Sequence, residues 1–87
     1  MDELKQNLWK MLDSIGRELD LNVGKTGVSN GKWIIVQDNR ITLSIFGREK
    51  EGEEAIMKIK MYLKENGIES SIEKSKNDKI FNFILKF

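Results

Sequence analysis

The side chains that could carry out chemistry in this chain are few. Its 87 residues include no cysteine and no histidine, which excludes thiolate nucleophiles, disulfides, imidazole bases and the metal sites built from these ligands. Carboxylates, lysines, hydroxyls and the single tyrosine, Tyr62, remain. These groups are sufficient for binding but form a thin set for catalysis. We therefore expect a protein without enzymatic activity, bound metal or cofactor.

Two local clusters match fragments of known binding sites, and each has a simpler explanation. Glutamates at positions 49, 51, 53 and 54 could bind a hard cation, but they fall at the start of an expected helix, whose positive dipole end they stabilise. The stretch from Gly24 to Lys32 contains glycines and lysines like a phosphate loop. It has neither the spacing of that motif nor a long helix directly after it. We expect these glycines to serve turns.

Apolar side chains recur at helical spacing in two segments. Residues 3–19 place leucine, methionine and isoleucine on an arc of about 100°, and residues 50–66 do the same before the stop signal Asn66-Gly67. In the second segment Met57 and Met61 lie nearly opposite the apolar face. They either pack sideways against the first helix or form an adaptable surface for a partner.

The remaining segments alternate apolar and polar residues and predict strands. We expect a weak first strand within residues 21–28, strong strands over 33–37 and 40–46, and a final pair over 68–74 and 79–87. Similar turn signals, Ser29-Asn30-Gly31-Lys32 and Lys76-Asn77-Asp78-Lys79, predict two hairpins. Their offset of 47 residues fits either an internal duplication or common turn chemistry.

The predicted order is α-β-β-β-α-β-β in a single domain spanning residues 1–87. We expect a two-layer α+β fold in which both helices cover one face of a mostly antiparallel five-stranded sheet. This order of elements resembles the start of bacterial type III secretion chaperones. The resemblance implies a dimer that binds other proteins.

The sheet face opposite the helices is the predicted binding surface. Strand alternation assigns to it five apolar residues that suit a protein partner or a second copy of the chain: Trp33, Ile35, Phe46, Ile80 and Ile84. Charge adds a second possibility, because the strand segments 21–48 and 68–87 together carry +4 whereas the helical segments 1–20 and 49–67 carry −3. Basic residues beside aromatic ones suit single-stranded nucleic acid, with six candidates: Trp33, Lys32, Arg40, Lys76, Lys79 and Lys86.

The net charge of +1 gives little long-range attraction for phosphate and favours protein contact. We expect a small non-catalytic regulator or inhibitor that acts through a protein–protein surface as a homodimer. The alternative is a single-strand nucleic-acid binder using the same sheet face. No apolar segment has the length of a membrane span and no signal sequence is evident, so we expect a cytoplasmic location without membrane contact.

Overall fold

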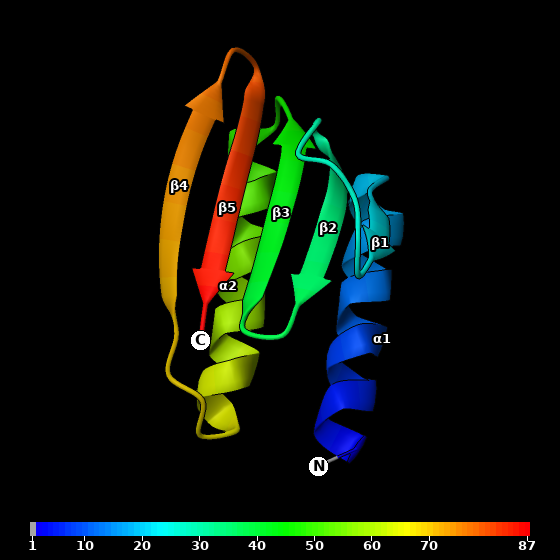
Figure 1. Ribbon diagram of the computed structural model, residues 1–87, viewed down its shortest axis with the longest axis vertical. Helices are drawn as coiled ribbons and strands as arrows, with labels where there is room; N and C mark the ends of the chain where they lie inside the picture. The colour runs from blue at the N-terminus through cyan, green and yellow to red at the C-terminus, as the bar shows by residue number, and fades with distance from the viewer. Residues whose placement is uncertain (1) are drawn as a thin grey trace.

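The computed structural model describes residues 2–87, with two helices packed on one face of a five-stranded sheet (Figure 1). The chain runs through α1 (Asp2–Leu19), β1 (Asn22–Gly24), β2 (Lys32–Gln37), β3 (Arg40–Phe46), α2 (Glu49–Glu65), β4 (Ser71–Asn77) and β5 (Ile80–Lys86). The predicted α+β class, element order and mostly antiparallel sheet are confirmed.

The last strand of the chain lies inside the sheet rather than at its edge. The spatial order is β1-β2-β3-β5-β4, and β5 pairs antiparallel with β3 on one side and with β4 on the other. The predicted hairpin at Lys76–Lys79 is confirmed: Asn77 pairs with Ile80, and Asp78 takes a positive φ of 57° in the turn between them. β4 is therefore held to the sheet by β5 alone.

The first predicted hairpin is wrong, because β1 runs parallel to β2. Asn22 pairs with Trp33 and Gly24 with Ile35, so residues 25–31 must carry the chain back along the sheet before β2 begins. The Ser29-Asn30-Gly31 turn does form locally: the Lys32 amide donates to Asn30 Oδ1 at 3.2 Å, and Gly31 has a φ of 91°. It redirects the chain into β2 without pairing the strands that flank it.

One core lies between the helices and the sheet. Its buried side chains come from both helices and from alternate positions of the inner strands: Leu8, Leu12, Ile15, Leu19, Leu21, Ile34, Ile41, Leu43, Ile45, Ala55, Ile56, Ile59, Leu63, Phe83 and Leu85. Of the three phenylalanines near the C-terminus, only Phe83 is buried in this core. Phe81 is half-buried, and Phe87 follows the end of β5 with 37% of its surface exposed.

Candidate binding surfaces

An apolar strip lies on the sheet face away from the helices. Cross-strand partners of an antiparallel pair share a face, and the register pairs Phe46 with Ile80 and Thr42 with Ile84. Phe46 is 55% exposed, and Ile80 and Ile84 are half-buried. We call Phe46, Ile80 and Ile84 the sheet strip.

The connection over residues 25–31 covers the other part of this face. A Cβ built on Gly27 would lie 2.6 Å from Cε3 of the Trp33 ring, and the Gly31 amide donates to Ser44 Oγ at 2.8 Å. Ile35 and Ser44 are consequently buried. Trp33, a predicted contact residue, therefore lies against this connection, and Ile35, a second one, is buried.

A small hollow separates the connection from the sheet strip. It has a volume of about 340 Å³, and Ser29, Ile35, Thr42 and Ile84 are among the residues lining it. Asn82 also lines it, and within residues 2–87 its buried Oδ1 has no hydrogen-bond partner.

The predicted nucleic-acid residues do not gather on one face. Lys32 pairs with Ile45 and Lys76 with Phe81, which places both lysines on the side of the helices. Lys76 Nζ lies 5.3 Å from the centre of the Phe81 ring. Lys79 lies in the β4–β5 turn.

The two basic residues on the open face already have partners. Lys86 Nζ lies 2.7 Å from Glu73 Oε2, and Arg40 Nε donates to Gln37 Oε1 at 3.1 Å. Gln37 is neutral, so only the charge of Lys86 is compensated, and the open face is less basic than the segment charges predicted.

Three of the four glutamates at the start of α2 lie within 4 Å of a basic side chain. Glu49 forms a hydrogen-bonded ion pair with Lys74, and that hydrogen bond raises the pKa of Lys74 above its ordinary value. Glu53 lies 4.0 Å from the same ammonium, and Glu51 lies 4.0 Å from Arg48. Residues 2–87 contain no group of three or more acidic side chains arranged to hold a metal ion.

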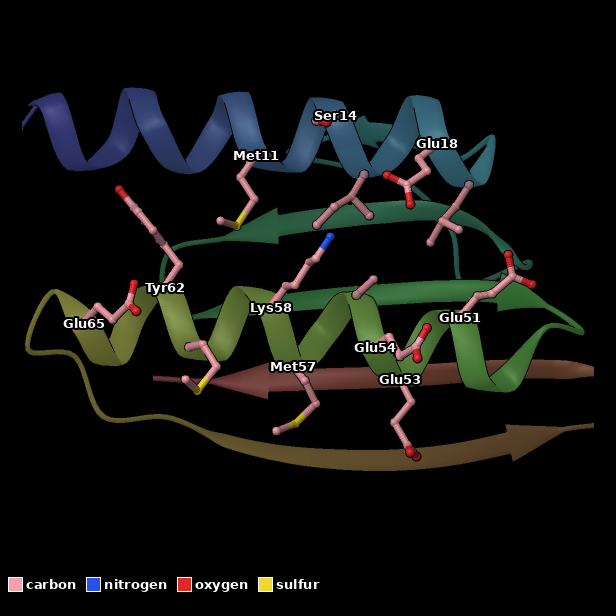
Figure 2. Close-up of a pocket in the computed structure, with 14 residues that line it drawn as sticks. Met11, Ser14, Glu18, Glu51, Glu53, Glu54, Met57, Lys58, Tyr62 and Glu65 are labelled. Atoms are coloured by element: carbon pink, nitrogen blue, oxygen red, sulfur yellow. The ribbon is translucent and has the colours of Figure 1, made fainter.

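A groove lies between the two helices, on the opposite side of the molecule from the sheet strip (Figures 1 and 2). Side chains from both helices line a hollow of about 940 Å³. Figure 2 shows Met11 and Glu18 pointing from α1 toward α2, and Lys58 and Tyr62 reaching from α2 toward α1. Sequence reasoning missed this groove. The available signal was a stripe beside the apolar face of each helix, spaced three or four residues apart: Met11, Ser14 and Glu18, and Glu51, Glu54, Lys58, Tyr62 and Glu65.

The two methionines singled out from the sequence remain at the surface. Met57 is 44% and Met61 51% exposed, and Figure 2 shows Met57 pointing away from α1. Sideways packing of Met57 against the first helix therefore does not occur. Both methionines contribute to the outer wall of the helix groove.

Comparison of the chain with protein-family models, with curated proteins and with solved structures found no match. Neither helix within residues 2–87 is long and apolar enough to cross a membrane. The functional assignment therefore rests on the two surfaces described above.

Proposed function

We propose that this chain is a non-catalytic binding protein that forms a weak homodimer through its open sheet face and acts as a regulator or inhibitor of a protein partner. The observation that carries the proposal is the uncovered sheet strip. Phe46 and Ile80 are direct cross-strand neighbours, and Ile84 lies on the same face of β5. Apolar side chains grouped on an open sheet face are typical of a contact surface.

A second copy of the chain is the occupant that suits this face best. Lys86 is paired with Glu73, and Arg40 donates a hydrogen bond to the neutral side chain of Gln37. An apolar patch with so little charge around it can pack against its own twofold copy, as two stacked sheets do. Single-stranded nucleic acid receives less support, because Lys32 and Lys76 lie on the helix side.

Pairing through the free edge of β4 is disfavoured. Residues directly opposite in a twofold antiparallel pair must share a face. A pairing centred on Lys74 sets Lys74 against its own copy, and one centred on Ser75 sets Lys74 against Lys76 of the other copy. Lysines on an edge strand are a common protection against such pairing.

The size of the strip sets the expected affinity. The strip lies on β3 and β5, and two strands spaced about 4.8 Å apart and about seven residues long give a patch of about 10 by 24 Å. This is well below the roughly 800 Å² per partner of a standard stable interface. We therefore expect a dimer that dissociates in the micromolar range or weaker.

Sedimentation equilibrium across micromolar to millimolar protein tests the proposal. We expect reversible dimerisation that Ile84→Lys abolishes, because the substitution places a charge inside the apolar contact. Met57→Lys is the matched control, since it adds the same charge to an exposed apolar site on the helix side. A monomer at all concentrations would contradict the proposed dimer. If only Met57→Lys abolished dimerisation, the dimer interface would lie on the helices.

Fluorescence anisotropy with labelled single-stranded nucleic acid distinguishes a protein binder from a nucleic-acid binder. We expect no micromolar binding at low salt. An affinity that falls steeply with rising salt and is weakened by Lys76→Glu would instead assign the chain to the nucleic-acid class. Binding to nucleic acid releases counterions from the phosphates, and added salt makes this release less favourable.

A further inference from the structure

The helix groove has a fixed frame. At one end, Arg48 Nη2 donates to the carbonyl oxygen of Leu19, the last residue of α1, at 2.8 Å. At the other end, the Tyr62 hydroxyl donates to the carbonyl oxygen of Leu4 at 3.2 Å. These two hydrogen bonds tie the antiparallel helices together at both ends. The stretch of α1 from Leu4 to Leu19 spans about 22 Å at the rise of an α-helix.

The groove combines an apolar floor with an acidic rim. Ile15, Leu19 and Ala55 line it and are buried, and Met11 extends from α1 toward α2. Five carboxylates line the hollow against one ammonium, that of Lys58: Glu18, Glu51, Glu53, Glu54 and Glu65. Within residues 2–87, Glu18, Glu54 and Glu65 have no cationic partner within 4 Å. This local excess of negative charge contrasts with the chain's net charge of +1.

We propose that the groove between α1 and α2 binds a cationic amphipathic helix of a partner protein. Its length accommodates about four helical turns. The apolar face of such a helix would cover the floor, where methionine adapts to varied side chains, and its basic residues would meet the glutamates of the rim.

The walls of the groove favour a helix over an extended segment. Both walls are helices whose backbone groups are bonded internally except near their ends. An extended peptide would therefore find few backbone partners along the groove, whereas a helix satisfies its own. The acidic rim also opposes phosphate groups, anionic lipid and the equally acidic rim of a second copy.

This site is independent of the proposed dimer, because the groove and the sheet strip lie on opposite faces of the sheet. Ile84→Lys should remove dimerisation and leave groove binding unchanged. Charge changes in the groove should do the reverse. Failure of one proposal is therefore distinguishable from failure of the other.

The test uses a labelled model peptide of about 15 residues, the length set by the groove, with leucines at helical spacing and lysines elsewhere. Its twin carries glutamates in place of the lysines. Binding to the full chain is followed by fluorescence anisotropy at low and at physiological salt. We expect saturable binding of the lysine peptide that weakens with salt, and no binding of the glutamate peptide.

Substitutions in the groove test whether the lysine peptide binds there. Glu18→Lys combined with Glu54→Lys should weaken the lysine peptide about tenfold or more, since two attractions become repulsions. Lys58→Glu should tighten it, a gain that partial unfolding cannot mimic. Glu69→Lys combined with Asp38→Lys is the matched control pair, because both residues are exposed, both lie outside the groove, and the two changes reverse the same number of charges.

Three results would overturn the proposal. These are absence of binding at low salt, equal binding of both peptides, and equal weakening by the control pair and by the groove pair. The last result would indicate a general charge effect instead of a site. A change of oligomeric state caused by the groove pair alone would identify a second copy of the chain as the occupant.

Discussion

Helix α2 lies close against the sheet at Gly52, and adding one methyl group there tests the packing. Gly52 is buried in the first part of α2. A Cβ at this position would lie 2.8 Å from Cε2 of Phe83 and 2.9 Å from Cγ2 of Ile45. Both neighbours are buried in the core. Carbon atoms in good contact lie about 3.5–4.0 Å apart, so Gly52→Ala requires α2 or the Phe83 ring to shift.

Two effects of opposite sign decide the outcome of Gly52→Ala. Alanine is favoured over glycine inside a helix by about 1 kcal/mol. Overpacking a well-filled core costs about 1–3 kcal/mol. Because both contacts are with rigid buried groups, we expect the second effect to dominate and the free energy of unfolding to fall by about 1 kcal/mol.

Urea unfolding followed by circular dichroism measures this change through the midpoint at unchanged m value. A double-mutant cycle with Phe83→Leu supplies the control, because the smaller side chain removes the ring atoms that the added methyl group would meet. The contact with Ile45 remains in that background, so Gly52→Ala should destabilise the protein less there than in the otherwise unchanged chain. If Gly52→Ala raised the stability of the otherwise unchanged protein by about 1 kcal/mol, the close approach of α2 to the sheet would be refuted.

Three further changes test other parts of the fold. Ending the chain at Lys79 removes β5, the only strand that pairs with β4, and should abolish the cooperative thermal transition; a retained transition would contradict the interior position of β5. Asp20→Gly should raise the free energy of unfolding by up to about 1 kcal/mol, as measured in urea, since Asp20 has a φ of 58° that glycine adopts more easily. The raised pKa of Lys74 implies that its pair with Glu49 stabilises the folded state. This stabilisation is fully present below the ordinary lysine pKa of 10.5 and is lost as pH rises through the folded-state pKa. Lys74→Gln should therefore show a smaller alkaline loss of stability than the unchanged chain, and equal losses would exclude a contribution from the pair with Glu49.

Local patterns predicted most of the fold because its helices and inner strands are strongly periodic. Residues 40–46 alternate polar and apolar side chains as far as Ile45, residues 80–86 form a nearly continuous run of large apolar side chains, and these segments are β3 and β5. The Asp78-Lys79 turn follows directly from local chemistry. β1 was harder to predict, because its three residues include a glycine and are too few to show an alternation of polar and apolar side chains. The Ser29-Asn30-Gly31 signal specified a turn but not which strands it would pair.

The binding surfaces could be predicted from the sequence only in part, because burial on the open face depends on contacts between residues distant in sequence. Alternation correctly assigned Phe46, Ile80 and Ile84 to one face. It could not reveal that Ser44 accepts a hydrogen bond from the Gly31 amide, 13 residues earlier. The helix groove likewise depends on the spacing of two helices, which Arg48 and Tyr62 fix through hydrogen bonds spanning 29 and 58 residues.

The placement of residues 25–31 over the open face has its own consequence for Trp33. A methyl group on Gly27 would lie 2.6–2.7 Å from two ring atoms of Trp33, whereas one on Gly24 would lie 3.4 Å from the same ring. Gly27→Ala should therefore displace the connection or the indole and expose Trp33 to water. With Trp9→Phe removing the second indole, we expect Gly27→Ala to shift Trp33 emission to longer wavelength and to increase its quenching by acrylamide. Gly24→Ala, whose methyl group finds nearly ordinary contact distances, should change both much less. Identical emission and quenching in the two variants would mean that the connection does not lie on Trp33, and the parallel pairing of β1 with β2 would lose its explanation.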